Sequence, residues 1–261
     1  LLISLILGSG FYFLGKKTDR KINFIDQLIL VVLVYITLGF LISIPFYLGN
    51  LQITFINSFF ESISGLTGTG FSTFNNIKYL DPTLILWRSS SQWIGGLFFL
   101  FFLILLFSNK SFNYKMTNLT FVGESNFKSE ENIKNILLKI FIFYCILSFL
   151  FFSLLNFSGV RLFNSLNLAM TLVSGGGFLP SDNLSEIISN NFQKIVLCFA
   201  LLITMLNFYL IFNIFDKKTI LKNHKEDFYL FLLAIFLILI IYLNEFDLSN
   251  VTISVLSSLS N

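Results

Sequence analysis

Two glycine-rich stretches interrupt apolar segments of the chain and have the composition of ion-binding loops. The first, residues 64–73, reads SGLTGTGFST, and the second, residues 173–178, reads VSGGGF. Glycine lets the backbone adopt positive φ and pack closely, so a short loop can turn several carbonyl oxygens to one side. Carbonyl oxygens arranged in this way replace the water shell of a cation. The pattern therefore predicts backbone coordination of a cation.

The two stretches resemble each other at a constant spacing of 107 positions. Identical residues at this spacing are Asn57/Asn164, Ser58/Ser165, Gly68/Gly175, Gly70/Gly177, Phe71/Phe178 and Asn76/Asn183. We expect the backbone of eight residues to line the ion path: Thr67, Gly68, Thr69, Gly70, Ser174, Gly175, Gly176 and Gly177.

Two alternatives remain open for the residues of these stretches. Their glycines can serve close helix packing instead, although two matched loops favour the ion-binding interpretation. Packing is the favoured role of Gly95 and Gly96, which lie in the middle of a long apolar segment. The hydroxyl groups of the first stretch either add oxygen ligands or stabilise the turn; they belong to Thr67, Thr69, Ser72 and Thr73.

The composition is that of an integral membrane protein. Of the 261 residues, 55% are hydrophobic and only 12% are charged, and mean hydropathy is +0.81. Such a chain cannot cover itself with polar residues. Thirteen of the seventeen Lys and Arg residues fall in segments 16–21, 110–139 and 217–225, which the positive-inside rule places in the cytoplasm. Nucleic-acid binding is disfavoured, because each basic run is short and joins two apolar segments.

The apolar segments that must position the two loops fall into two length classes. Two segments, 53–65 and 161–172, directly precede the loops. A helix of thirteen residues reaches about 20 Å and cannot cross a hydrocarbon core of about 30 Å. We therefore expect each short helix to enter the membrane and return on the same side. Longer apolar segments are 24–48, 84–107, 136–157, 192–215 and 228–243, and residues 1–14 continue a further one.

The predicted fold is an all-α integral membrane protein with repeated span–short pore helix–glycine loop–span units around a central pore. A third unit is expected to begin at Phe228, because Ser254, Ser258 and Ser260 repeat Ser58, Ser62 and Ser64. The chain starts without Met and resembles an internal fragment. The predicted divisions are an N-terminal helix end with a basic loop, 1–23; a first unit, 24–109; a cytoplasmic connector, 110–135; a second unit, 136–216; and a connector with the third unit, 217–261.

Two opposite charges sit where the membrane is expected. Glu61 lies in the first short helix and Arg88 near the start of the next long segment. Charges at membrane depth are costly unless they are paired or functional. We hypothesise an ion pair that supports the first loop; separate contacts with water are the alternative. The lone His224 and the separated Cys145 and Cys198 suggest neither a metal site nor a disulfide framework.

The sequence resembles the TrkH/KtrB potassium transporters, of the Trk/Ktr/HKT superfamily. Residues 60–72, FESISGLTGTGFS, resemble the first pore loop of that family, and residues 86–97, LWRSSSQWIGGL, resemble the helix that follows it. Residues 174–178 are similar to the second loop. The resemblance implies four units around one pore, with the third and fourth filters beyond residue 261. It implies one selectivity glycine per unit, which places K⁺ at Gly70 and Gly177; Gly68 stands where the family usually has threonine.

The resemblance further implies the pore-forming subunit of a potassium uptake system in the bacterial plasma membrane. It also implies a homodimer and a cytoplasmic nucleotide-binding regulatory subunit similar to TrkA or KtrA, with K⁺ as substrate and no cofactor. The alternative is an ion-coupled secondary transporter with re-entrant broken helices, which ionisable residues in mid-span would favour. The chain has almost none there. A membrane enzyme would need a cluster of His, Asp, Glu or Cys that is not evident, so no enzymatic activity is predicted.

Overall fold

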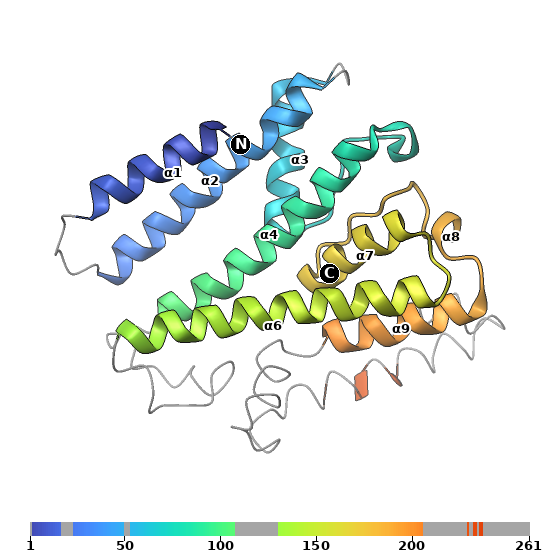
Figure 1. The fold of residues 1–261 in the computed structure, drawn as a ribbon. Helices are drawn as coiled ribbons and strands as arrows, with labels where there is room; N and C mark the ends of the chain where they lie inside the picture. The colour runs from blue at the N-terminus through green and yellow to red at the C-terminus, as the bar shows by residue number, and fades with distance from the viewer. Residues whose placement is uncertain are drawn as a thin grey trace.

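The computed structural model describes residues 2–16, 23–49, 53–107 and 130–205, with the single positions 229, 232, 233, 235 and 236. Every regular element in this part of the chain is helical, in agreement with the predicted all-α class (Figure 1). Most of the predicted third unit and of the three basic segments lies outside the described residues, as does His224.

Five of the described helices lie in the apolar segments that the sequence predicts to be longer. They are α1 (Leu2–Gly15), α2 (Phe24–Leu48), α4 (Pro82–Phe107), α6 (Glu130–Phe157) and α9 (Asn191–Met205). By length and composition, α2 and α6 can cross a membrane over residues 25–48 and 134–157. The 26 residues of α4 extend about 39 Å at 1.5 Å per residue. The long helices thus correspond to the apolar segments of the sequence.

Helix α6 begins earlier than the apolar pattern predicts. Residues 130–135 were expected to belong to a connector, but they form the first turns of this helix. Extending an existing helix adds one hydrogen bond for each residue that is fixed, so helices continue readily past their apolar segment.

The two short helices are α3 (Phe55–Thr67) and α7 (Leu162–Ser174), each of 13 residues. Both end at a glycine in the left-handed region, Gly68 at φ 69° and Gly175 at φ 67°. A left-handed conformation costs other residues about 1–2 kcal/mol, which is why glycine stands at both ends. Matching backbone hydrogen bonds close the two ends: Gly68 to Gly65, Thr69 to Ser64, Gly175 to Leu172 and Gly176 to Thr171.

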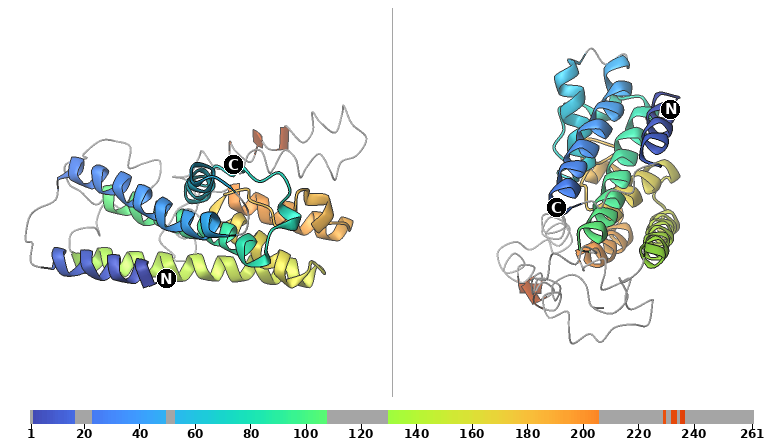
Figure 2. Two further views of the ribbon diagram at one scale, coloured as in Figure 1. Left: turned by 90° about the horizontal axis from the view of Figure 1, so that it is seen from above. Right: turned by 90° about the vertical axis from the view of Figure 1, so that its left-hand side faces the viewer.

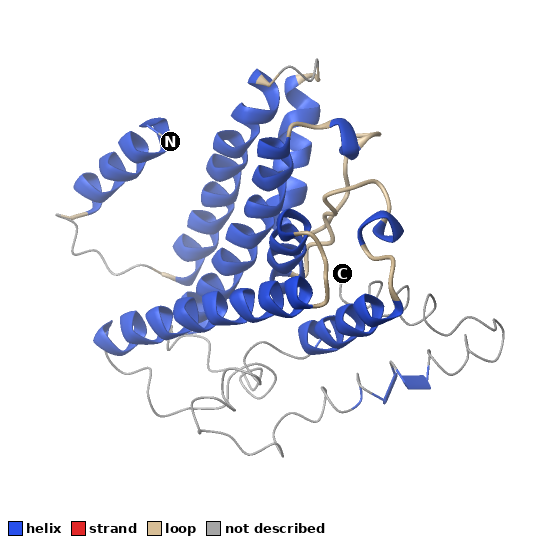
Figure 3. Ribbon diagram, turned by 45° about the vertical axis from the view of Figure 1, so that its right-hand side comes forward, coloured by secondary structure: helices blue, strands red, loops and turns tan. Residues whose placement is uncertain are grey.

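Helix α4 lies at the centre of the described structure. It contacts α2, α3, α6 and α7, and the end-on view places it between the α2–α3 pair and the pair α6 and α9 (Figure 2). Helix α3 packs between α2 and α4, and α7 packs between α4 and α6. Helix α1 stands apart from these helices (Figure 3). The turn η1 (Ile77–Tyr79) and the single-turn helix α8 (Leu184–Ile187) follow the two glycine loops.

The distribution of polar and apolar side chains suits a lipid environment. Large apolar side chains are exposed on α2 and α6, among them Ile29, Val32, Leu33, Ile142 and Phe149. Soluble monomers rarely expose continuous apolar surfaces of this kind. By contrast, α3, α4 and α7 carry buried polar side chains: Ser58, Glu61, Ser62, Ser64, Arg88, Ser89, Ser91, Gln92, Ser165, Asn167 and Thr171. Among them, Glu61, Arg88 and Gln92 contact the two loops.

Candidate functional site

The two glycine loops lie against each other although 107 positions separate them in sequence. Gly70 and Gly177 both have φ of 74°. A Cβ atom on Gly70 would lie 2.6 Å from the carbonyl oxygen of Gly176 and 3.6 Å from the Cα atom of Gly177. Only glycine combines this dihedral angle with so close an approach of two backbones. The structure therefore brings the two predicted selectivity glycines together.

A cavity of about 360 Å³ adjoins the carboxyl ends of both short helices. Thr67 and Gly68 line it from the end of α3, and Ser174 and Gly175 line it from the end of α7. A helix carries roughly half a negative charge at its carboxyl end, because its last carbonyl groups have no partner within the helix. Two such ends at one cavity make a favourable place for a cation.

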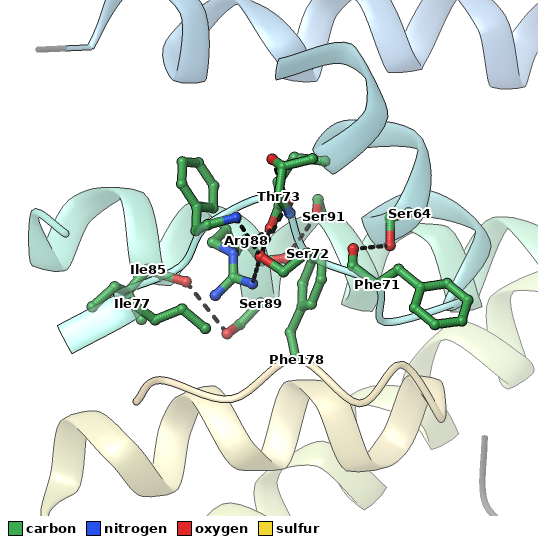
Figure 4. Close-up of polar contacts among 12 residues, drawn as sticks. Ser64, Phe71, Ser72, Thr73, Ile77, Ile85, Arg88, Ser89, Ser91 and Phe178 are labelled. Carbon is green, nitrogen blue, oxygen red and sulfur yellow. Dashed lines mark hydrogen bonds and ion pairs between the residues drawn. The ribbon is translucent and has the colours of Figure 1, made fainter. Parts of the chain in front are cut away.

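Glu61 and Arg88 form the ion pair that the sequence suggested. The Arg88 Nε atom lies 2.7 Å from Glu61 Oε1, and both side chains are almost fully buried. The Glu61 carboxylate also accepts from the Ser72 hydroxyl at 3.0 Å and from the Thr73 backbone N–H at 2.9 Å. Figure 4 shows Arg88 beside Ser72 and Thr73 of the first loop. The carboxylate thus connects the far end of the first loop to α3.

Arg88 also reaches the second loop, which sequence reasoning did not anticipate. Its Nη1 group donates to the carbonyl of Leu179 at 3.3 Å, and its guanidinium carbon lies 4.2 Å from the centre of the Phe178 ring. A cation over an aromatic face is attracted by the ring's charge distribution. Its Nη2 group donates to Ser72 at 3.1 Å (Figure 4). One buried side chain therefore contacts both loops.

Sequence reasoning also did not assign a role to Gln92. This residue follows Arg88 by one helical turn on α4 and is fully buried. Its amide donates to the carbonyl of Gly176 and accepts from the N–H of Phe178 at 3.2 Å. The sequence does show a polar amide inside an apolar segment. Because Gln92 follows Arg88 by four positions, the two side chains lie on the same face of the helix. The sequence alone could not identify the partner of that amide.

The hydroxyl groups of the first loop donate to nearby protein oxygens. Thr67 donates to the carbonyl of Ile63 at 2.8 Å, and Thr69 donates to Ser64 Oγ at 3.0 Å. Ser64 in turn donates to the carbonyl of Phe71 at 2.5 Å. These bonds close the loop on itself, so the geometry favours turn stabilisation over direct ligation by the hydroxyls.

Gly95 and Gly96 let α4 approach the ends of both short helices. A Cβ atom on Gly95 would lie 2.1 Å from the carbonyl oxygen of Leu66 in α3. A Cβ atom on Gly96 would lie 2.9 Å from the Cβ atom of Ser174 in α7. This geometry fits the packing role of the two glycines. The close packing of α4 against α3 and α7 also positions the carboxyl ends of the short helices at the cavity.

Within the described ranges, no group of three or more His, Cys, Asp or Glu side chains could hold a metal ion. Neither Cys145 nor Cys198 forms a disulfide in the described part of the chain, and both side chains are partly buried. The polar groups that meet at the site are instead backbone carbonyls, hydroxyls, one amide and one ion pair. Such a set suits a weakly held, singly charged cation better than a tightly ligated divalent metal.

Comparison with known proteins gives concordant results. Residues 1–257 match the sequence model of the TrkH family, described as cation transport protein. The chain is 28% identical to an uncharacterized cation transporter of Methanocaldococcus jannaschii, over 72% of this chain and 39% of that protein. It is 24% identical to the Trk system potassium uptake protein TrkG of Escherichia coli, over 82% of this chain and 45% of TrkG. The chain thus spans less than half the length of these relatives.

The fold comparison agrees with the sequence comparison. The crystal structure of the potassium transporter TrkH from Vibrio parahaemolyticus matches with a TM-score of 0.73, covering 93% of this chain and 51% of that one. At 20% identity this likeness concerns the fold alone. Because the family match covers nearly the whole sequence, this chain belongs to the TrkH family of cation transport proteins.

Proposed function

We propose that the two glycine loops form part of a selective pathway for K⁺ across the membrane, in the pore-forming subunit of an uptake system. The observation that carries this proposal is the meeting of two helix carboxyl ends at one cavity, directly beside two glycine loops. The helix ends favour a cation there. The relatives from Escherichia coli are named potassium uptake proteins, which supports K⁺ as the ion.

Backbone carbonyls are the proposed ligands. In the first loop they belong to Thr67, Gly68, Thr69 and Gly70. In the second loop they belong to Ser174, Gly175, Gly176 and Gly177. The Gly176 carbonyl also accepts from Gln92, and its oxygen has two lone pairs. These oxygens replace part of the water shell of the ion, and further units of the whole protein supply the rest of the ring. Glu61 and Arg88 support the first loop from behind rather than touch the ion.

The cellular setting is part of the same proposal. The subunit lies in the bacterial plasma membrane with its basic segments in the cytoplasm. A nucleotide-binding regulatory subunit binds on the cytoplasmic side. Two pore subunits form a homodimer in the membrane. Asn76 and Asn183 follow the two loops at equivalent positions. Cysteines introduced at both should react with an impermeant thiol reagent from outside the cell. Labelling of only one would contradict the re-entrant arrangement of the short helices.

Ion preference in the whole protein tests the assignment of the filter. Gly70→Ser and Gly177→Ser each place a side chain at φ of 74°, and at Gly70 this side chain meets the carbonyl of Gly176 in the second loop. Both variants should lower the preference for Rb⁺ over Na⁺ about tenfold, equivalent to about 1.4 kcal/mol of relative binding. The measurement is Rb⁺ uptake in competition with Na⁺, in cells without their own uptake systems and at equal amounts of membrane protein.

Gly10→Ser is the matched control, because nothing lies within 4 Å of a Cβ atom at this position in α1. It should keep the original ion preference. If both filter variants also keep it, the selectivity filter does not lie in these two loops.

A further inference from the structure

Residues on both sides of Gly177 are held by one side chain from outside the loop. Gln92 lies on α4, while the loop connects α7 to α8. Its Nε2 group donates to the carbonyl of Gly176, and its Oε1 atom accepts from the N–H of Phe178 at 3.2 Å. Both polar ends of the amide are thus used on the two neighbours of the candidate filter glycine.

The contact is close enough to fix the loop. A Cβ atom on Gly176 would lie 2.3 Å from the amide carbon of Gln92 and 2.6 Å from its nitrogen and oxygen. The Gln92 side chain is fully buried, so water does not compete for these bonds. A glycine at positive φ is otherwise free to rotate its peptide groups. Anchoring residues 176 and 178 restricts the orientation of the Gly177 carbonyl between them.

The first loop does not need such an anchor because its own short helix supplies one. Ser64 of α3 donates its hydroxyl to the carbonyl of Phe71, which follows Gly70. The residue that corresponds to Ser64 in α7 is Thr171, and its hydroxyl donates to Leu168 within its own helix. The bond to the loop made in the first unit is therefore not made in the second, and Gln92 of α4 binds the residue corresponding to Phe71 instead.

We propose that Gln92 is a positioning residue that sets the ion preference of the second loop, acting from the helix that follows the first loop. The inference rests on the proposed function, in which Gly177 takes part in selectivity. It adds that the second filter position depends on a hydrogen-bonding side chain of the preceding unit.

The test is Gln92→Met in the whole protein, which keeps the length of the side chain and removes both hydrogen bonds. The preference for Rb⁺ over Na⁺ should fall at least threefold at equal levels of membrane protein. Gln92→Asn, which keeps a buried amide but is one methylene too short to reach both partners, should lower the preference in the same direction.

Gln193→Met is the matched control. Gln193 is also buried, and its Oε1 atom accepts from the N–H groups of Ser189 and Asn190, which lie outside the glycine loops. This variant should change the ion preference less than twofold. If loss of any buried glutamine disturbs the protein, the Gln193 and Gln92 variants should change the ion preference equally. That result would overturn the inference.

Gly177→Ser separates this inference from the proposed function. One outcome is that Gly177→Ser alters the ion preference while both Gln92 variants keep the original preference or slow the uptake of both ions equally. In that case Gln92 has no positioning role, and the filter assignment is still supported. If Gly177→Ser and the Gln92 variants all keep the original preference, the filter assignment and the inference both fail.

Discussion

The two glycine loops share the φ values of their matching glycines but have different supports. Gly68 and Gly175 close the short helices at nearly equal φ, and Gly70 and Gly177 share φ of 74°. The first loop is tied to its own helix by the carboxylate of Glu61. The residue of α7 that corresponds to Glu61 is Leu168, which is buried in an apolar cluster with Leu155 and Leu197.

The support of the second loop comes from α4. Gln92 binds the loop on both sides of Gly177, and Arg88 donates to Leu179 and lies over the ring of Phe178. The same helix carries the ion pair that supports the first loop. Two similar loops therefore do not require similar supports, because side chains of one central helix can contact both loops.

The largest expected effect is the loss of Glu61. Glu61→Leu removes the partner of a buried guanidinium group and the hydrogen bonds from the Ser72 hydroxyl and from the N–H and hydroxyl of Thr73. Breaking a buried ion pair on one side costs about 3–5 kcal/mol, because the remaining charge is left without compensation. Unfolding of the whole protein in detergent micelles should show a destabilisation of this size, with a weaker preference for Rb⁺ over Na⁺.

The double variant Glu61→Leu with Arg88→Met sharpens this result. Removing both charges avoids the unpaired guanidinium group, so the double variant should be more stable than Glu61→Leu alone. A double variant that is less stable than either single one would mean that the two side chains act independently.

A second prediction concerns Leu168, the apolar counterpart of Glu61. Leu168→Gln places an amide in an apolar cluster, where burying an unsatisfied polar group costs about 1–3 kcal/mol. The destabilisation should appear in the same micelle measurement. If Leu168→Gln left stability unchanged, the new amide would have found a polar partner near the second loop. The contrast between the two loops would then be lost.

A third prediction concerns the feature that the loops share. Gly68→Ala and Gly175→Ala place a Cβ atom at a left-handed position, which costs about 1–2 kcal/mol. The nearest atoms to a Cβ atom on Gly68 lie 3.8 Å away, so the effect at Gly68 is conformational and not steric. The two variants should be destabilised equally within about 0.5 kcal/mol. A larger difference would show that the two helix ends are not equivalent.

The smallest expected effect is at the exposed ends of the two loops. Lys78 of η1 lies 3.8 Å from Glu186 of α8, and both side chains are exposed to solvent. Exposed ion pairs contribute at most about 1 kcal/mol and often nothing measurable. Lys78→Met should leave both unfolding and ion preference unchanged. A clear change in ion preference would place this pair among the supports of the filter.

Much of the fold follows from the sequence because helix formation in an apolar chain is local. The segment predicted as 24–48 is helix α2 over the same residues, and the segment predicted as 84–107 lies within α4. The short helices were located to within two residues. The start of α6 was missed, because polar residues at a helix end carry no periodic signal.

The sequence by itself determined the glycine loops, their spacing of 107 positions and the short helices before them. These features depend on residue type and on the length of apolar segments, both of which can be read along the chain. It also suggested the pairing of Glu61 with Arg88, because two opposite charges in an apolar setting lower their free energy by meeting.

Only the tertiary structure decided how the second loop is held. The contacts of Arg88 with Phe178 and Leu179, and those of Gln92 with Gly176 and Phe178, join residues more than eighty positions apart. No local pattern specifies them, because the path of the chain through α6 and α7 brings the second loop back to α4. The polar groups of α4 acquire their roles from that packing.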